Sequence, residues 1–344
     1  MMDTLITLDY ELFLNDKVGT IDKCLIEPME QLNKVCLIHD IKVTIFVDAA
    51  YIYRLKQLSE KSKDARNEYN KVINHVKSLS QFGHDIELHI HPQWFYSNFD
   101  NKIWNLDWEH YKLSDMSFDE VIPRFNECVH LLEEIVDSKV IGFRAGGYSI
   151  QNFNLFADLL NSNGIKIDSS VLPRARTARD NKTHNYDYRF VPHKALYRFL
   201  TNVVNEDKNG YNWELPISTF RQNLIGYLLD KRKNMRAYQS VNWGDGGDDP
   251  LPFYKRITSG VKKLSLFHTI SASIDYQSFF HINKVYQHHK HLKSDFFTII
   301  GHPKNFSPDS LSYLNQFLYR LEKDNIRIIT LKDLLKNIAV SYTH

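Results

Sequence analysis

Two histidines and two carboxylates have the spacing of a metal site. In the stretch GHDIELHIHPQW, His89 and His91 lie two positions apart at the end of an alternating apolar run. Near the N-terminus, in LDYEL, Asp9 and Glu11 have the same spacing. Residues two apart on extended backbone point to the same side. Glu11, His89 and His91 could therefore hold a zinc ion with an open position for water, while Asp9 stays free as a general base.

Each pair also has an ordinary structural explanation. Asp9 and Glu11 could form a solvated strand end before a turn. Of the two histidines, one could lie in the core and the other could form a hydrogen bond at the surface. A single histidine would favour that explanation, but two histidines on one face at a strand end favour a metal site.

Three further polar residues close predicted strands. Arg144, in GFRAGGYS, could pair with the base carboxylate, and the glycine-containing loop after it could present an N–H group to an oxyanion. His302, in IIGHPK, could donate a proton to a leaving group. Asp168 closes the run GIKID. An ordinary strand-to-helix turn with a structural ion pair would also explain Arg144, and His302 is a weak signal by itself.

Short β-branched runs alternate with amphipathic stretches along the chain. The runs predicted as strands are 5–9, 42–48, 85–91, 139–145, 165–170, 213–218, 264–271, 296–302 and 326–330. The predicted helices include 63–82, 118–137 and 151–163. Such alternation indicates a parallel sheet or a barrel, in which active-site residues collect where strands end. Residues 172–295 are the least regular, and we expect them to be an elaboration between core strands.

Composition excludes several classes of function. The chain has 344 residues, of which 43% are apolar and 24% charged, and its net charge is +2. This balance is typical of a soluble globular protein and gives no overall field for nucleic acid or a membrane surface. No apolar run reaches the length of a membrane-spanning helix. The three cysteines, Cys24, Cys36 and Cys128, match no zinc spacing and predict free thiols. The strand-like start at Thr4 leaves no room for a signal peptide, so we expect a cytoplasmic protein.

Three other clusters could bind ions. QHHKHL, residues 287–292, is interpreted as an exposed helix face rather than a metal site. WGDGGDDP, residues 243–250, lacks the ligand spacing of a calcium-binding EF-hand and is interpreted as a loop. Arg174, Arg176 and Arg179, in RARTARD, could be solvated or could bind phosphate or carboxylate bidentately. The last cluster predicts an anionic substrate subsite.

The order of the strand-end motifs resembles the polysaccharide deacetylases, carbohydrate esterase family 4, which have the NodB-homology fold. TLDYE, GHDIELHIHP, FRAGGYS, GIKIDSS and IIGHPK resemble the motifs of that family in sequence order, and IRIITLKDLL resembles its closing strand and helix. The resemblance implies an α/β fold, a distorted (β/α) barrel with a long insertion. We expect one such domain over residues 1–338, with the elaboration at about 172–295 and a C-terminal tail at 339–344.

The resemblance also implies roles for the strand-end residues. Asp9 corresponds to the catalytic base, with Arg144 in contact with it, and His302 corresponds to the acid, oriented by Asp168. Glu11 and His89 fall on metal ligands. The family's second metal histidine lies four residues after the first, where this chain has Gln93. We expect His91 to replace it, because it lies beside His89 on the same face.

These roles imply a metal-dependent N-deacylase, a hydrolase of C–N amide bonds in an amino-sugar glycan or its precursor. The divalent metal, with zinc preferred, would lower the pKa of a bound water and polarise the substrate carbonyl. Asp9 would take the proton, an N–H near Gly147 or Tyr148 would hold the oxyanion, and His302 would protonate the amine. The cytoplasmic location favours a nucleotide- or lipid-linked carbohydrate substrate of surface-polysaccharide biosynthesis.

Two other functions stay open on the sequence. Gln93 is compatible with a non-catalytic glycan-binding barrel that has lost its metal. A glycoside hydrolase with paired carboxylates would need no metal, so sensitivity to EDTA would distinguish it from a deacetylase.

Overall fold

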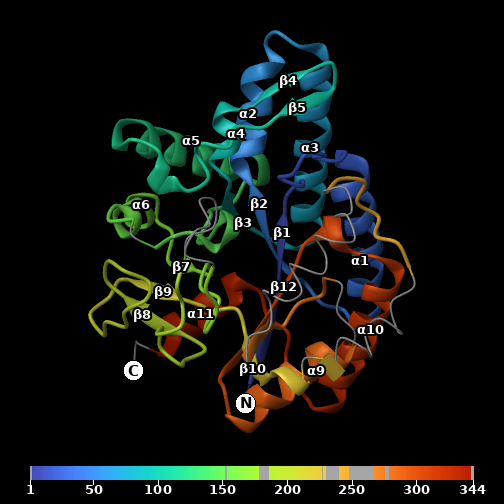
Figure 1. Ribbon diagram of the computed structural model, residues 1–344, viewed down its shortest axis with the longest axis vertical. Coiled ribbons are helices and arrows are strands. Elements are labelled where there is room, and N and C mark those ends of the chain that lie inside the picture. The colour runs from blue at the N-terminus through green and yellow to red at the C-terminus, as the bar shows by residue number, and fades with distance from the viewer. Residues whose placement is uncertain are drawn as a thin grey trace.

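The alternating apolar runs form one eight-stranded sheet in the computed structural model, which describes residues 2–151, 153–177, 186–226, 228–229, 240–247, 267–275 and 279–341 (Figure 1). The strands in spatial order are β12 (Phe296–Gly301), β1 (Asp3–Tyr10), β2 (Thr44–Asp48), β3 (Asp85–Ile90), β6 (Gly142–Ala145), β7 (Ile167–Asp168), β9 (Asn212–Glu214) and β8 (Tyr197–Phe199). Each neighbouring pair is parallel except β8 and β9. The carboxyl ends of seven strands therefore meet at one edge, where the polar motifs were expected.

The sheet curls until its two sides approach each other. After β9, the backbone N–H of Ser218 donates to the carbonyl of Thr298 in β12 at 3.0 Å, and Thr298 N–H returns a bond to Ser218 Oγ at 2.9 Å. A parallel bridge also joins Ser273 to Ile300 of β12. Short irregular segments thus close the gap, which gives the distorted (β/α) barrel that the family resemblance implied.

Helix α11 (Leu331–Ser341) fills the amino-terminal end of this barrel. Leu331, Leu334 and Ile338 form a buried cluster with four residues from the strands and their ends: Leu5, Phe46, Ile167 and Leu215. At the start of α11, Leu331 N–H donates to Thr44 Oγ1 at 3.0 Å, on the first residue of β2. Because apolar side chains occupy this end, the carboxyl end of the strands is the end that remains available for a site.

The other long helices pack around the outside of the sheet (Figure 1). They are α1 (Glu27–Ile38), α2 (Ala49–Ser59), α3 (Lys63–Gln81), α5 (Phe118–Val136), α6 (Phe156–Ser162), α9 (Phe279–His291) and α10 (Pro308–Lys323). Smaller elements are α4 (Gln93–Tyr96), the pair β4 (Asn98–Asp100) and β5 (Ile103–Asn105), the pair β10 (Thr219–Asn223) and β11 (Phe267–Ser271), and helical turns at Asp22–Ile26, Leu113–Asp115, Gly146–Tyr148 and Pro303–Asn305. Helix α5 begins with a capping box, in which Ser117 N–H and Oγ donate to Glu120 Oε2.

Some predicted elements differ in the structure. Residues 326–330 were expected to be a strand, but they make only an isolated bridge, Thr4 with Ile328, because Thr330 already caps the start of α11 through Asp333. The described part of the predicted strand 264–271 is β11, which pairs with β10 outside the barrel. Strands β8 and β9 show that part of the predicted elaboration belongs to the main sheet. Within the described residues, no helix has both the length and the apolar character to cross a membrane.

Candidate metal and catalytic site

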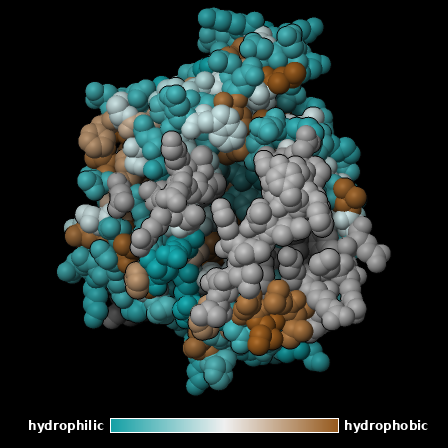
Figure 2. All heavy atoms as spheres, viewed as in Figure 1, coloured by the Kyte–Doolittle hydropathy of each residue, from teal (hydrophilic) through white to brown (hydrophobic). Residues whose placement is uncertain are grey.

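A pocket opens at the carboxyl ends of the central strands, with a cavity volume of about 430 Å³. In the view of Figure 1, the space-filling picture shows a hydrophilic recess over these strand ends (Figure 2). The residues that line the pocket include five of those predicted from the sequence: Asp9, Glu11, His89, His91 and His302. The other two, Arg144 and Asp168, are fully buried and do not line it.

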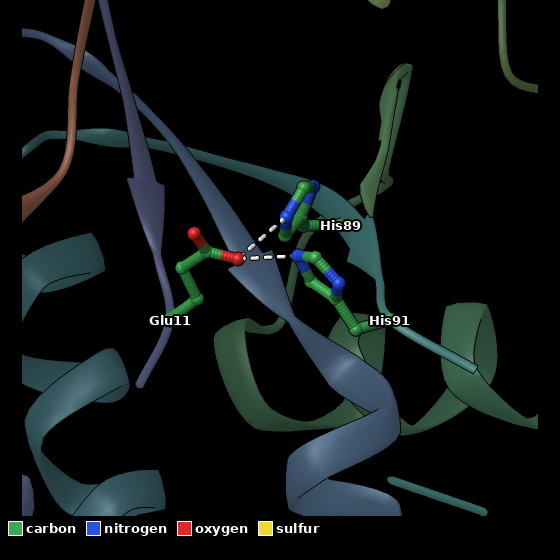
Figure 3. A group of neighbouring side chains, drawn as sticks. All are labelled: Glu11, His89 and His91. Carbon is green, nitrogen blue, oxygen red and sulfur yellow. Dashed lines mark hydrogen bonds and ion pairs between the residues drawn. The ribbon is translucent and has the colours of Figure 1, made fainter. Parts of the chain in front are cut away.

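Three of the lining residues form one compact group (Figure 3). Glu11 Oε2 lies 2.5 Å from His91 Nε2 and 3.2 Å from His89 Nε2, and the three possible ligand atoms lie within 4.8 Å of one another. All three residues are buried. Gly146 allows this arrangement, because a Cβ at that position would lie 2.6 Å from His91 Nδ1.

This group fits a divalent metal such as zinc. His89 Nδ1 lies 2.7 Å from the carbonyl oxygen of Arg144, so Nδ1 carries a proton and Nε2 is the nitrogen turned to Glu11. Two imidazole nitrogens and one carboxylate oxygen are a usual zinc donor set. Burial lowers the pKa of His89, but the hydrogen bond to Glu11 and the nearby carboxylates outweigh it and raise the pKa above its ordinary value. A proton and a metal ion therefore compete for His89 Nε2.

Gln93 lies outside this group. It begins α4, its side chain is 0% exposed, and it is not among the residues that line the pocket. Strand β3 ends at Ile90, and the backbone N–H of His91 then donates to Asp48 Oδ1 at 3.2 Å. This anchor places the His91 ring at the pocket, as expected if His91 replaces the missing histidine. The metal itself stays a prediction.

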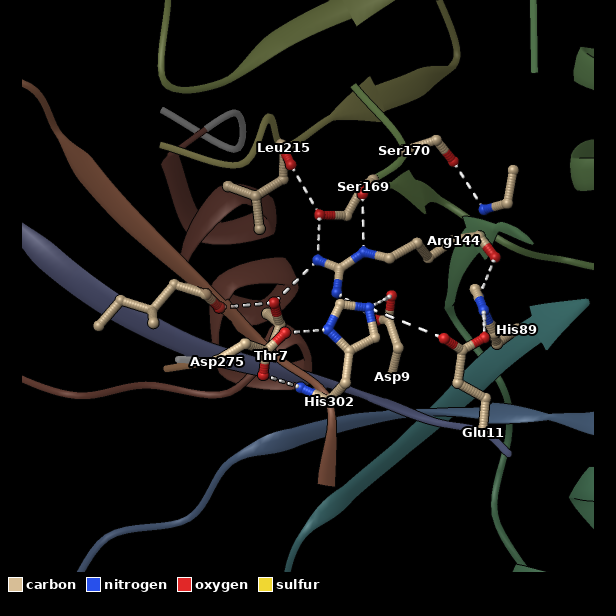
Figure 4. A network of polar contacts seen from close by, with 12 residues as sticks. Thr7, Asp9, Glu11, His89, Arg144, Ser169, Ser170, Leu215, Asp275 and His302 are labelled. Carbon is tan, nitrogen blue, oxygen red and sulfur yellow. Dashed lines mark hydrogen bonds and ion pairs between the residues drawn. The ribbon is translucent and has the colours of Figure 1, made fainter. Parts of the chain in front are cut away.

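Asp9 is held by the fully buried Arg144 (Figure 4). Arg144 Nη1 donates to Asp9 Oδ1 at 2.6 Å, while its other nitrogens donate to Thr7 Oγ1 and to Ser169. Burial alone would raise the pKa of Asp9, but the positive charge of Arg144, aided by His89 and His302, lowers it below the usual value. Asp9 is thus a carboxylate at neutral pH.

His302 lies on the other side of Asp9, with Nε2 at 3.5 Å from Asp9 Oδ2. Its ring Nδ1 pairs with Asp275, and its backbone N–H donates to Asp275 Oδ1 at 2.7 Å. Burial lowers the pKa of His302, but the negative charge of Asp275 outweighs this effect and raises the pKa to about 9. His302 therefore carries a proton at neutral pH, and it stands beside a carboxylate that does not.

The structure corrects the expectation that Asp168 orients His302. Asp168 lies opposite Glu214 in the register of β7 and β9, and its Oδ1 accepts from Ser170 Oγ at 2.6 Å. Burial raises the pKa of both Asp168 and Glu214 within the barrel wall. The residue that contacts the His302 ring, Asp275, was missed because it lies in the irregular region, although it follows a strand-like run.

Lys304 is a second residue that the sequence did not reveal. Its Nζ donates to Glu11 Oε1 at 2.8 Å and to the carbonyl of Leu12 at 2.9 Å, and the side chain is buried. Burial raises the pKa of Glu11, but Lys304 and then His91 outweigh it and hold the pKa well below its usual range. Lys304 thus neutralises one oxygen of Glu11 and leaves the other directed at the histidines. The same positive charge opposes a cation at the group.

We expect Lys304→Met to bind zinc more tightly than the parent protein. Removing one positive charge beside the group lowers the repulsion of a divalent ion, and a gain of ~1.4 kcal/mol gives about tenfold tighter binding. Zinc titration by calorimetry measures the affinity, and the rise of Tm on adding zinc gives an independent value. Lys304→Arg keeps the charge and should behave like the parent. Equal zinc affinity in Lys304→Met and the parent would contradict this account.

The clusters QHHKHL and WGDGGDDP have ordinary structural roles in their described parts. In QHHKHL, Gln287, Lys290 and His291 are exposed, but His289 is partly buried and lies 3.1 Å from both Ser294 Oγ and the carbonyl of Thr219. In WGDGGDDP, Asp245 accepts from the N–H and Oγ1 of Thr20, and residues 248–250 lie outside the described part of the chain, as does Arg179.

Comparisons with known proteins identify a similar fold but no related sequence family. No protein-family model matches the sequence, and no curated protein matches it. A solved structure described as a polysaccharide deacetylase from Mycobacterium smegmatis is similar with a TM-score of 0.53 at 14% identity, covering 99% of this chain and 91% of that chain. A Puue allantoinase is similar with a TM-score of 0.50 at 11% identity, covering 100% and 92%. At these identities the similarity shows a shared fold.

Proposed function

We propose that this protein is a metal-dependent N-deacylase, a hydrolase of C–N amide bonds, that acts on an amino-sugar glycan or its precursor. The observation that carries the proposal is the pair formed by Asp9 and His302. One is ionised, the other protonated, and their nearest atoms lie 3.5 Å apart beside the Glu11, His89 and His91 group. Amide hydrolysis requires a base that is ionised and an acid that is protonated in the same pocket, and Asp9 and His302 meet these two requirements.

The proposed metal ligands are Glu11, His89 and His91, and zinc is the proposed ion. When bound there, the ion supplies a water of lowered pKa and polarises the acyl oxygen. Asp9 accepts the proton of the attacking water, and Arg144 keeps the Asp9 carboxylate ionised and in place. After attack, His302 Nε2 donates its proton to the departing amine. The products are a carboxylate and an amino sugar.

The loop after β6 supplies the proposed oxyanion donor. Gly147 and Tyr148 line the pocket and both have left-handed backbone, with φ of 56° and 58°. For Tyr148 this conformation costs roughly 1–2 kcal/mol, and a hydrogen bond from Tyr188 Oη to the Tyr148 carbonyl at 2.6 Å helps to hold it. Within the described residues, the backbone N–H of Tyr148 donates no hydrogen bond to a carbonyl group outside its own helical turn. That N–H is therefore available to an oxyanion.

Aromatic side chains support a carbohydrate as the substrate. Trp108 and Tyr111 line the pocket, and Trp108 is 49% exposed. Large rings with one apolar face and one polar edge can pack on a sugar ring and form hydrogen bonds to it. The cavity volume of about 430 Å³ lies within the range of small-ligand sites. A cytoplasmic location and a role in surface-polysaccharide biosynthesis are further parts of the proposal.

The test is hydrolysis of N-acetylglucosamine oligomers by the purified 344-residue chain. We expect released acetate and free amine, loss of both after EDTA, and recovery on adding zinc. Asp9→Asn should lower kcat by about 10²–10⁴-fold with zinc present. Release of new reducing ends in EDTA would instead indicate a glycoside hydrolase. Oligomer binding without acetate release at any metal concentration would indicate a non-catalytic glycan-binding protein.

The non-catalytic alternative rests on Lys304. Its ammonium group already compensates the negative charge of Glu11. In a metalloenzyme, the bound metal ion would compensate that charge. A buried ion pair of this kind would keep the pocket folded without any ion. Direct metal analysis of the purified protein separates the two candidates before any substrate is identified.

A further inference from the structure

A second groove lies outside the candidate active site and is lined by four arginines. Its cavity volume is about 890 Å³, and its wall includes Arg174, Arg176, Arg189 and Arg221. We call it the arginine groove. Arg221 comes from β10, whereas the other three come from segments that precede β8 in the chain. The fold thus brings together arginines that are far apart in sequence.

A short two-stranded ribbon separates the groove from the candidate active site. Residues 174–177 and 186–189 are joined by antiparallel backbone hydrogen bonds, with Arg176 opposite Asp187. Tyr186 and Tyr188 stack on each other, with ring centroids 5.0 Å apart, and Tyr186 meets Tyr148 of the active-site loop edge to face. Because alternate residues on extended backbone point to opposite faces, Arg176 and Arg189 lie on the face of the ribbon away from these tyrosines.

Within the part of the chain that the structure describes, the positive charge of the groove is mostly uncompensated. Arg189 donates to both oxygens of Asp187, through Nε at 2.7 Å and Nη2 at 2.5 Å. Within the described residues, no ion pair involves Arg174, Arg176 or Arg221. Four guanidinium groups against one carboxylate leave a net charge of about +3 along the wall. A single carboxylate ligand would balance only part of it, whereas a diphosphate carries two to three negative charges.

The backbone of Arg174 is held in an unfavourable conformation at this wall. Its φ is +67°, a left-handed value that side-chain-bearing residues avoid. Two hydrogen bonds maintain it: Arg174 N–H donates to the Tyr188 carbonyl at 2.9 Å, and Thr269 Oγ1 donates to the Arg174 carbonyl at 3.1 Å. Glycine would fit this position without strain. The strain at Arg174 is consistent with a function for its guanidinium, and the charge of the groove carries the argument.

We propose that the arginine groove binds the diphosphate group of a sugar diphosphate ester. Guanidinium groups form paired hydrogen bonds to phosphate oxygens, and several of them around one cavity can bind both phosphates. Phe190, 84% exposed, and Phe267, 50% exposed, add aromatic surface at the same groove, and the Arg221 guanidinium lies 4.3 Å from the Phe267 ring centroid. That the diphosphate group is part of the substrate rests on the proposed deacylase function. The binding of a diphosphate group in the groove does not depend on that function.

The test measures binding to the purified 344-residue chain by calorimetry at fixed ionic strength. The probes are pyrophosphate, UDP as a nucleoside diphosphate, and geranyl diphosphate as a prenyl diphosphate. We expect pyrophosphate to bind, and to bind more weakly as salt rises. Whichever ester binds more tightly than pyrophosphate identifies the source of the diphosphate. Failure of all three probes to bind the parent protein would overturn the proposal.

Arg174→Gly is the decisive variant. It removes one guanidinium and relieves the backbone strain, so the protein should fold at least as well as the parent while binding of each probe falls about tenfold or more. Arg221→Ala should show a similar loss. His302→Ala, in the other pocket, should bind the probes like the parent. Unchanged binding in Arg174→Gly and Arg221→Ala would overturn the assignment of the groove.

The two proposals fail separately. Probe binding without deacylase activity would leave the groove assignment standing and refute the proposed function. Deacylase activity on neutral oligomers without probe binding would support the proposed function and refute the groove assignment.

Discussion

Replacing His91 by alanine should abolish stoichiometric zinc binding, whereas replacing Gln93 by alanine should leave it unchanged. His91 Nε2 lies 2.5 Å from Glu11 Oε2, and Gln93 does not line the pocket. Neutral imidazole is a good zinc ligand and a glutamine amide is a poor one. Removal of outer-shell partners already costs about 10–100-fold in metal affinity. We therefore expect the loss of a direct ligand to exceed about 100-fold.

Zinc titration after removal of bound metal measures this difference, and Tm without zinc checks that each variant is folded. His289→Ala is a matched control, because His289 is a partly buried histidine that lies outside the pocket. If both His91→Ala and Gln93→Ala keep the parent stoichiometry, the ligand assignment is wrong. If the parent itself takes up no zinc under metal-replete conditions, the non-catalytic barrel becomes the better interpretation.

Asp275→Asn should shift the alkaline limb of the activity profile to lower pH. In the proposed mechanism His302 must be protonated, so activity is lost as the pH rises through the pKa of His302. Asp275 raises that pKa to about 9 against the opposing effect of burial. An asparagine keeps the shape of the side chain but removes the charge, so the His302 pKa falls and activity is lost earlier as pH rises. His302→Gln should lower kcat by about 10²–10⁴-fold.

Profiles of kcat/KM against pH for the parent, Asp275→Asn and Asp168→Asn provide the measurement. Asp168→Asn is the informative control, because Asp168 bonds Ser170 and faces Glu214 rather than His302. It should leave the alkaline limb in place even if it changes stability. A shift in Asp168→Asn with none in Asp275→Asn would return the orienting role to Asp168 and contradict the structure.

Much of the fold could be predicted because the relevant signals are local. Apolar alternation at 5–9, 42–48 and 85–91 corresponds to β1, β2 and β3, and a parallel sheet follows from the helices between them. The same periodicity placed His89 and His91 on one side of the chain. Since parallel strands bring their carboxyl ends to one edge, the approach of Glu11 to these histidines was also predictable.

The partners of these residues depended on the tertiary structure. Asp275 contacts His302 from an irregular segment, and Lys304 contacts Glu11 from the short helical turn Pro303–Asn305. Packing and isolated hydrogen bonds set the paths of these segments, and no sequence periodicity marks them. The lateral register of β7 and β9 pairs Asp168 with Glu214 and so removes it from the site. Arg221 joins Arg174 only because β10 folds back beside the ribbon. Residue spacing determines the face of an element on which a side chain lies, but the long-range path of the chain determines which charges meet there.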